Sequence, residues 1–365
     1  MAELKKIVIQ DFRNITLQEL EFSPNVNCIC GLNGAGKTNL LDAIYYLSMT
    51  KSAFAATEKF NFRHGCDTFC LAGDYAMPSG IVSHFSIKVE EGGGKHILRD
   101  SKPYQKLSDH IGILPVVMVS PSDSAMVSES GDERRRFVNG VLSQMDAEYL
   151  SAVQQYSKLL SGRNMLLKES APAEDLLNAF DVRMSHYASM VYQKRKTFVE
   201  ELLPVVRQYY TRISSGRGEL DISYRSDLSS GPLESVLYSH REKDRIFKYT
   251  TAGIQRDDFI FTLDGYPIRR CGSQGQQKSF LVALKFAQYE IMKLRYGFPP
   301  IMLLDDLFDK LDTERMTSLL QMVSGEDFGQ IFLSDTNRDR IKNLLDKLTS
   351  DRSYFECRDG VFEKI

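Results

Sequence analysis

The chain of 365 residues contains no run of about 18 apolar residues, and this absence predicts that no segment spans a membrane. Residues 1–9 follow a strand pattern and lack the apolar core of a signal peptide. Internal repeats and low-complexity tracts are also missing. We therefore expect a cytoplasmic protein that folds as one large domain or two ordinary ones.

Cysteine is sparse, and neither sign of charge dominates. The 6 cysteines are dispersed, and Cys66 and Cys70 have no matching Cys or His pair at metal-ligand spacing. Cys28 and Cys30 alternate within a strand pattern, so both should face one side as small apolar residues. These features predict reduced thiols. Because the formal net charge is -2 at pH 7, nucleic-acid binding would need a local basic patch.

What the sequence does contain is a complete phosphate-binding loop. Residues 31–38 match the pattern G-x-x-x-x-G-K-[ST] between a strand pattern at 25–30 and a helix pattern at 39–47. In this setting, backbone N–H groups and the helix N-terminus attract the phosphates of ATP or GTP. We expect Lys37 to reach the β- and γ-phosphates and the Thr38 hydroxyl to bind Mg²⁺. The expected nucleotide-binding residues of this stretch are Gly31, Leu32, Asn33, Gly34, Ala35, Gly36, Lys37, Thr38 and Asn39.

A strand pattern at 300–304 ends in two carboxylates, Asp305 and Asp306, which is the form of a Walker B strand. Adjacent side chains of a strand point in opposite directions, so two tasks are expected. Asp305 would hold Mg²⁺, and Asp306 would orient or deprotonate the attacking water as a catalytic residue together with Lys37. The alternative is a buried parallel strand with a solvated acidic end. About 270 residues separate Lys37 from Asp305, which predicts a sizeable insertion between two halves of a nucleotide-binding domain.

A third element, at residues 273–276, precedes the acidic strand and opens a helix pattern. It offers a hydroxyl and free N–H groups at a helix N-terminus through Ser273, Gln274, Gly275 and Gln276. The loop at 31–38 does not need this second anion site, so we expect it to complete the site of another subunit. An ordinary serine N-cap is the alternative. Ser334 and Thr336, after a later strand pattern, are expected either to sense the γ-phosphate or to cap the next helix.

These elements and their order resemble the ATP-binding-cassette heads of the SMC and Rad50 class, and more closely the RecF family of bacterial recombination mediator ATPases. The resemblance covers most of the chain. It includes Ile-Gln-Asp-Phe-Arg-Asn at 9–14, Glu-Arg-Arg-Arg-Phe at 133–137, the Tyr…Arg-Asn segment at 156–164, and the elements at 273–278 and 303–306. The phosphate loop is shared by many families, whereas the other segments in this order are more specific.

The resemblance implies an α/β fold, namely an ABC-type, SMC/Rad50-like P-loop ATPase head with a β-rich lobe and an inserted α-helical arm. Residues 1–120 would form the N-terminal part of the head, 121–249 the arm, and 250–365 the C-terminal part with the signature motif, Walker B strand and D-loop. Apolar spacing predicts arm helices in 146–167 and 174–212, and Pro204 is expected to end or kink the second.

For function, the resemblance implies an ATP- and Mg²⁺-dependent protein of DNA repair, replication and recombination. ATP would join two heads into a homodimer that closes on double-stranded, single-stranded or gapped DNA. Weak, DNA-stimulated hydrolysis would reopen it, slowly because Asp306 replaces the usual glutamate. Partners of the RecO and RecR type would then help to load recombinase at single-strand gaps. The alternatives are a transporter's nucleotide-binding subunit, an SMC-like head with a non-repair partner, or a metabolic P-loop kinase.

The resemblance also implies that Arg13, in the Phe-Arg-Asn opening, belongs to the nucleotide site. A basic cluster follows at 134–136, formed by Arg134, Arg135 and Arg136. Two interpretations of this cluster stay open. Its side chains contact DNA phosphates independently of sequence, or they belong to a solvated helix face.

Two positions depart from the family pattern. The arginine that often follows Ser52 is absent, so a basic contact there is expected from Lys59 or Arg63, and we count Arg63 among the candidate DNA contacts. The family often has Gly-Pro-His-Arg where this chain has Gly-Ile-Gln-Arg at 253–256. Any function given to that histidine is therefore not transferred to this chain.

Overall fold

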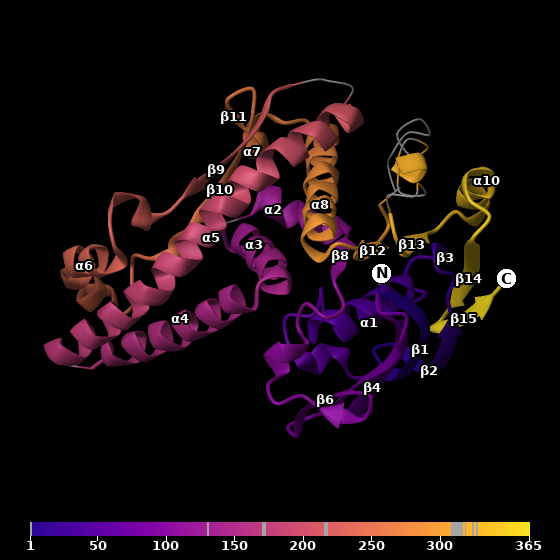
Figure 1. Ribbon diagram of the computed structural model, residues 1–365, viewed down its shortest axis with the longest axis horizontal. Coiled ribbons are helices and arrows are strands. Elements are labelled where there is room, and N and C mark those ends of the chain that lie inside the picture. Colours follow the sequence, from indigo (N-terminus) through magenta and orange to yellow (C-terminus); the bar gives the residue numbers. More distant parts are fainter. Residues whose placement is uncertain are drawn as a thin grey trace. The chain divides into compact units, whose positions relative to one another are not determined.

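The computed structural model describes residues 2–129, 131–169, 173–214, 218–307, 317, 319–322, 325 and 328–365. The chain divides into two compact units, whose elements are labelled in Figure 1. Met1–Asp123 and Val282–Ile365 form the first, which we call the head unit. Ser124–Leu281 form the second, which we call the arm unit.

One sheet of the head unit is antiparallel, with the strand order β2-β1-β4-β5-β6-β7. Its strands are β1 (Glu3–Phe12), β2 (Ile15–Glu21), β4 (Thr68–Ala76), β5 (Val82–Glu90), β6 (Gly94–Arg99) and β7 (Lys102–Pro103). Side chains alternate between buried and more exposed along β4, as expected when one face of a sheet packs on a core. The β-rich lobe expected of the head is confirmed.

The other sheet carries the phosphate-loop strand and has the order β15-β14-β3-β13-β12-β8. Its strands are β3 (Val26–Cys30), β8 (Val116–Val119), β12 (Ile301–Leu304), β13 (Ile331–Asp335), β14 (Arg352–Arg358) and β15 (Val361–Lys364). All but β15 run parallel, so their carboxyl ends lie at one edge of the sheet. The thiols of Cys28 and Cys30 lie 3.4 Å apart on one side of β3, as the alternation predicted.

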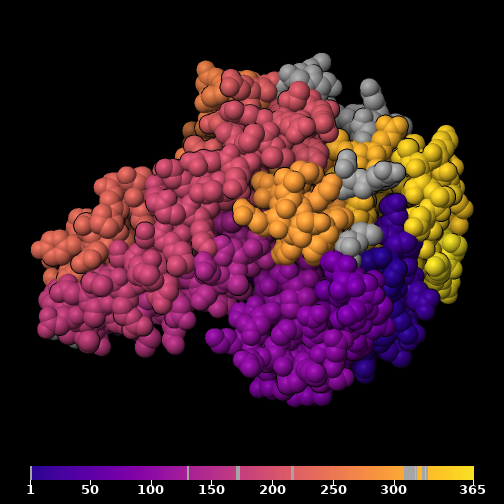
Figure 2. All heavy atoms as spheres, viewed as in Figure 1, coloured from indigo at the N-terminus to yellow at the C-terminus, as the bar shows by residue number. Residues whose placement is uncertain are grey.

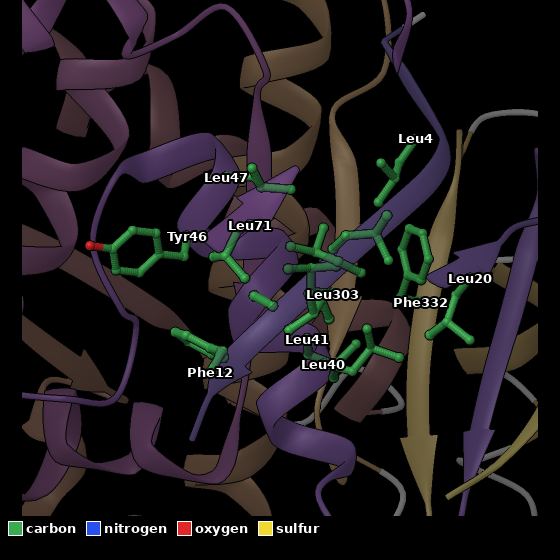
Figure 3. Packing of buried hydrophobic residues seen from close by; sticks show 14 of the residues in the cluster. Leu4, Phe12, Leu20, Leu40, Leu41, Tyr46, Leu47, Leu71, Leu303 and Phe332 are labelled. Atoms are coloured by element: carbon green, nitrogen blue, oxygen red, sulfur yellow. The ribbon is translucent and has the colours of Figure 1, made fainter. Parts of the chain in front are cut away.

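Helix α1 (Lys37–Met49) contacts strands of both sheets, and one apolar cluster surrounds it. Figure 3 shows Leu40, Leu41 and Leu47 of α1 in one cluster with Phe12 and Leu303. Most residues of α1 are buried in this cluster, so packing holds the helix, and with it the helix N-terminus at Lys37, in one position. On the face shown in Figure 2, the indigo N-terminal residues adjoin the yellow C-terminal ones, since β14 pairs with β3 and β15 contacts β2. The remaining elements are η1 (Glu58–Asn61), η2 (Leu107–His110) and α10 (Arg338–Leu348).

The arm unit is mainly helical, and its longest helices, α4 and α5, lie side by side (Figure 1). Its helices are α2 (Ala125–Ser128), α3 (Gly131–Met145), α4 (Ala147–Leu166), α5 (Glu174–Ser214), α6 (Leu233–Phe247) and α7 (Ile268–Cys271). Helix α8 (Gln274–Tyr296) begins in this unit, and its short turns are η4 (Asp227–Ser230) and η5 (Ile254–Arg256). The turn η3 (Pro121–Ser124) ends the first segment of the head unit and enters the arm unit at Ser124. Within the described part of the chain, no helix combines the length and apolar character needed to cross a membrane.

The arm differs from the expected one in three respects. It also holds an antiparallel sheet of β9 (Leu220–Arg225), β10 (Asp258–Leu263) and β11 (Tyr266–Pro267), so residues 121–249 are not purely helical. Because β10 pairs with β9, residues 250–281 fold with the arm unit rather than with the C-terminal part of the head. Pro204 does not end α5 either, since buried Leu202 and Val206 on both sides keep that stretch packed.

Candidate nucleotide-binding site

A pocket of ≈ 140 Å³ lies in the head unit where β3, β13 and β12 end. The parallel pairing brings these carboxyl ends together, although β3 and β12 are far apart in sequence. The lining residues are Asn33, Gly34, Gly36, Lys37, Thr38, Asn39, Asp305, Asp306 and Ser334. The structure therefore assembles most of the predicted loop residues and both predicted aspartates around one space.

Gly36 and Gly31 of the loop show two different reasons why glycine is required there. Gly36, which precedes α1, has a φ of 120°, in the left-handed region where a β-carbon is unfavourable. At Gly31, a β-carbon would lie 2.4 Å from the carbonyl oxygen of Cys357 on β14. The loop thus follows a path that side chains would block, as expected of a backbone that wraps a phosphate group.

Lys37 is the buried cation of the pocket, with 6% of its surface exposed. Its ammonium donates hydrogen bonds to the carbonyl oxygens of Gly31 at 2.8 Å and Leu32 at 3.0 Å. Both acceptors belong to the phosphate loop, so the loop itself holds the ammonium group of Lys37 in place. The Gly36, Lys37 and Thr38 N–H groups have no hydrogen-bond partner among the described residues. A buried ammonium beside free N–H groups at a helix start is suited to bind an anion.

Asp305 is held by two hydroxyl groups. Thr38 Oγ1 donates to both carboxylate oxygens at 3.0 Å, and Ser334 Oγ donates to Oδ1 at 2.7 Å. The Asp306 N–H in turn donates to Ser334 Oγ at 3.0 Å. Ser334 takes this position because β13 lies between β3 and β12. Ser334 therefore belongs to the pocket, as one of the two alternatives predicted. The other alternative, a cap on the next helix, is wrong for both Ser334 and Thr336, because Asn337 caps α10.

Burial raises the pKa of Asp305 above its ordinary value, and the neighbouring Asp306 adds to the effect. The hydrogen bonds from Ser334 and Thr38, and the charge of Lys37, oppose this rise without cancelling it. A cation beside the carboxylate would favour its ionised form. A threonine hydroxyl and a carboxylate are oxygen ligands of the type that Mg²⁺ accepts, so the donor set fits that ion.

Asp306 faces the same pocket as Asp305, contrary to the alternation on which its prediction was based. Strand β12 ends at Leu304, and Asp306 adopts a φ of 47° in the left-handed region. Aspartate tolerates this conformation better than most side chains. The turn therefore brings both carboxylates to the pocket from one short segment.

Arg13 does not line the pocket but fixes the helix behind it. Its guanidinium forms an ion pair with fully buried Asp42 at 2.6 Å and donates hydrogen bonds to Asn39 Oδ1 at 3.0 Å and Ser52 Oγ at 2.9 Å. Burial raises the pKa of Asp42, and Arg13 is the strongest opposing influence. Arg13 thus acts on the pocket through Asn39.

Asn14 is a residue of the site that the sequence analysis left without a role. Its amide donates to the carbonyl oxygen of Ala35 at 3.1 Å and accepts a hydrogen bond from Asn39 at 2.7 Å. These contacts tie the turn between β1 and β2 to the phosphate loop. The signal in the sequence was its place beside Arg13 in the Phe-Arg-Asn segment.

Residues 273–276 lie in the arm unit at the start of α8. The Gln276 N–H donates to Ser273 Oγ at 3.2 Å, and the Ser273 N–H donates to Gln276 Oε1 at 2.8 Å. This reciprocal pair of hydrogen bonds is a capping box. The predicted alternative, in which Ser273 is an N-cap, is therefore confirmed for the single chain. Ser273, Gln274 and Gly275 remain exposed.

The basic cluster at the start of α3 is largely used within the arm unit. Arg134 binds Asp258 with two hydrogen bonds, at 2.8 and 3.1 Å. Arg135 donates to the carbonyl oxygen of Asp257 at 2.5 Å and pairs with Asp132. Arg136 pairs with Glu133 at 2.8 Å, yet 73% of its side chain is exposed. Of the cluster, Arg136 is therefore the side chain most accessible to a DNA phosphate.

The Arg-Asn part of the 156–164 segment has a structural role. Arg163 is fully buried and binds Asp181 at 2.6 Å and Asp244 at 2.7 Å. These partners come from α5 and α6, so one guanidinium joins three helices. Arg163 is thus not placed to contact an external ligand.

Two other predicted features remain. Arg63 is half-buried, and its backbone N–H donates to the carbonyl oxygen of Asp11 at 3.0 Å. Its guanidinium has no hydrogen-bond or ion-pair partner in the described part of the chain. The D-loop segment at 308–312 lies outside the described residues.

Comparisons with known proteins agree with this geometry. A family model described as an AAA domain matches residues 6–179. The "DNA replication and repair protein RecF" of Bacteroides thetaiotaomicron is 40% identical over 363 residues, covering 99% of this chain and 98% of that protein. The protein of the same description from Phocaeicola vulgatus is 41% identical over 359 residues, covering 98% and 97%.

Among solved structures, a "recombination mediator protein RecF-ATP in RecFOR pathway" superposes with a TM-score of 0.90 at 29% identity, covering 100% of this chain and 98% of that one. An Smc head domain from Pyrococcus furiosus superposes with a TM-score of 0.58 at 15% identity, covering 100% and 96%, which shows the fold alone. The fold and the pocket together define a P-loop ATPase head of the ABC type. The chain belongs to the RecF family of DNA replication and repair proteins.

Proposed function

We propose that the chain is an ATP-dependent DNA-binding protein that acts in recombinational repair and replication. The observation that carries the proposal is the pocket itself, in which Lys37, Thr38 and Asp305 meet although Thr38 and Asp305 are 267 residues apart in the chain. Their contacts are those a triphosphate with its metal ion requires.

In this proposal, Lys37 and the free N–H groups at the start of α1 bind the phosphates, and Thr38 and Asp305 supply oxygen ligands for Mg²⁺. When bound, Mg²⁺ neutralises phosphate charge. Asp306, whose backbone Ser334 holds, orients or deprotonates the attacking water. An aspartate reaches less far than a glutamate, so hydrolysis is slow and the ATP-bound state is long-lived.

Residues 273–276 of a second copy would cover the γ-phosphate, which makes ATP part of a homodimer interface. Support comes from their exposure at the N-terminus of α8, a helix of 23 residues whose dipole favours an anion there. ATP then acts as a switch, because it binds the closed dimer better than the separated heads.

The partners in this proposal are duplex or gapped DNA and mediator proteins of the RecO and RecR type, which would help to load recombinase at single-strand gaps. The names of the relatives support this reading, since they refer to DNA replication and repair and to a RecFOR pathway. A transporter subunit or a metabolic kinase finds no comparable support.

The test is DNA binding with and without nucleotide, measured by fluorescence anisotropy on gapped duplex. We expect tight binding with ATP and Mg²⁺, weak binding without them, and loss of the ATP effect in Lys37→Met. Arg183→Ala, which removes an exposed arginine of α5, serves as the matched control. DNA binding that ignores nucleotide in the unmodified protein would contradict the proposal.

A further inference from the structure

The arm unit has a pocket with a volume of ≈ 560 Å³ that is separate from the nucleotide site. It lies where the start of α3, the end of α4, the end of β9 and the segment before β10 meet. All its lining residues belong to the arm unit, and none contributes to the pocket around Lys37. Its volume is in the range of pockets that hold a small organic ligand, about 300–1,000 Å³.

Two arginines at this pocket have little or no neutralising contact. The Arg256 side chain is exposed and has no ion-pair or hydrogen-bond partner among the described residues. The Arg225 side chain is 70% exposed, and among the described residues it reaches one carboxylate, that of Asp258, at 3.7 Å. Asp258 is already neutralised by its closer pair with Arg134 at 2.8 Å. The available charge in this part of the pocket is therefore positive, which suits a phosphate group.

The remaining acidic lining residue does not reverse this balance. Asp132 pairs with Arg135, whose guanidinium also donates to a backbone carbonyl oxygen. The two charges offset each other, with the Arg135 side chain mostly buried and the Asp132 side chain exposed. An anionic ligand thus meets Arg225 and Arg256 without a matching excess of carboxylates.

An aromatic side chain stands beside these cations. Tyr249 lines the pocket with 42% of its surface exposed. The next residue, Thr250, is anchored because its N–H and hydroxyl both donate to Asn164 Oδ1 at 2.7 Å. The backbone that carries Tyr249 is therefore held in place, and the Gln255 and Asn164 amides lie in the same lining. The Gln255 amide is already used, because Tyr156 donates to its Oε1 and its Nε2 donates to the carbonyl oxygen of Ala252. The ring offers a stacking surface for a nucleobase, and Asn164 Nδ2, which has no acceptor among the described residues, can donate a hydrogen bond to the base.

We propose that this pocket takes one unpaired nucleotide of a DNA strand, with its phosphate on Arg225 and Arg256 and its base against Tyr249. A base within duplex is stacked and cannot enter a pocket, whereas an unpaired base can leave the strand and do so. The inference rests on the proposed DNA binding and adds a preference for DNA that contains a single-stranded gap. It also gives a role to Arg256 in the segment at 253–256, where the chain departs from its family's pattern.

The experiment compares the affinity for a blunt duplex with that for the same duplex carrying a single-stranded gap, both with ATP and Mg²⁺. The variants are Tyr249→Ala, Tyr249→Phe and the double change Arg225→Ala with Arg256→Ala, with Arg183→Ala as the control. We expect Tyr249→Ala and the double variant to lose about tenfold in affinity for gapped DNA and little for blunt duplex. Tyr249→Phe keeps the ring and should bind like the unmodified protein.

Further readouts separate the outcomes. ATP-dependent dimerisation should be unchanged in every variant, because the pocket and the nucleotide site share no residue. Equal losses on both DNAs, or losses no larger than those of Arg183→Ala, would overturn the pocket and leave the proposed DNA binding intact. Saturable binding of thymidine monophosphate that the variants abolish, with gapped-DNA affinity unchanged, would assign the pocket to a free nucleotide and overturn the inference. An unmodified protein without DNA affinity would overturn both proposals.

Discussion

Ser334 shows how single hydroxyl groups organise the phosphate pocket. It donates to Asp305 and accepts from the Asp306 N–H, so one side chain positions both carboxylates. We predict that Ser334→Ala leaves the protein folded but raises the Mg²⁺ concentration needed for half-maximal ATP turnover about tenfold, since a buried carboxylate loses a hydrogen bond of about 1–3 kcal/mol.

Thr336→Ala is the matched control for that variant, because Thr336 is an exposed hydroxyl residue two positions further along and does not line the pocket. The measurement is a Mg²⁺ titration of ATP turnover. Identical titration curves for the two variants would contradict the role given to Ser334.

Arg163 belongs to a segment that carries the family resemblance, but its contacts in the structure are those of a residue that stabilises the fold. Its removal would leave Asp181 and Asp244 buried without their main partner, although Arg241 still reaches Asp181. We predict that Arg163→Met lowers the free energy of unfolding by about 3–5 kcal/mol, as is usual when one partner of a buried pair is removed.

Urea denaturation followed by circular dichroism measures that change, with Arg183→Ala as the exposed control. At temperatures where Arg163→Met stays folded, its affinity for DNA should equal that of the unmodified protein. A loss of DNA affinity without a loss of stability would show instead that Arg163 contacts the ligand.

At the scale of elements, the start of α8 has two roles that can be separated. Ser273 caps the helix, and the proposal also places it against a phosphate of a second copy. We predict that Ser273→Asp keeps the stability of the protein, because aspartate is as good an N-cap as serine, but abolishes ATP-dependent dimerisation through charge repulsion.

Ser273→Ala gives the opposite pattern in stability, with an expected loss of about 1 kcal/mol. Urea denaturation and sedimentation velocity with ATP distinguish the two effects. Dimerisation of Ser273→Asp at the level of the unmodified protein would remove residues 273–276 from the interface.

The sequence identified elements whose signals are local. Spacing over a short stretch of sequence predicts the glycine loop at 31–38, the apolar strands that precede the loop and the two aspartates, and the long arm helices. It missed β9, whose existence depends on pairing with β10 more than 30 residues later. Of the two outcomes expected at Pro204, an end of the helix was wrong, because tertiary packing on both sides outweighs one missing N–H in α5.

The site shows the same division. Lys37, Thr38 and Asp305 were predicted because each belongs to a short motif with its own chemistry. Ser334 was predicted only as one of two alternatives and Asn14 was given no role, because their contacts depend on the strand order and the loop path, which are long-range properties of the fold. The turn at Asp306 could not be foreseen, since an apolar strand pattern does not show where the strand ends.

At the scale of the whole molecule, the net charge of -2 means that binding to DNA depends on local groups. The structure reduces the candidates in the Arg134–Arg136 cluster to Arg136, because its neighbours are held by Asp258 and Asp257. It adds Arg225 and Arg256 in the arm pocket. Such contacts make the affinity fall steeply with salt, independently of DNA sequence.

The most direct test of the account is the sedimentation of Asp306→Asn with ATP and Mg²⁺ at micromolar protein concentration. An asparagine keeps the shape of the side chain but cannot accept a proton from water, so ATP should bind and remain intact. We predict a stable dimer for Asp306→Asn, a dimer that dissociates as ATP is consumed for the unmodified protein, and a monomer for Lys37→Met. A monomeric Asp306→Asn at saturating ATP would contradict the central claim that ATP joins two copies of this chain.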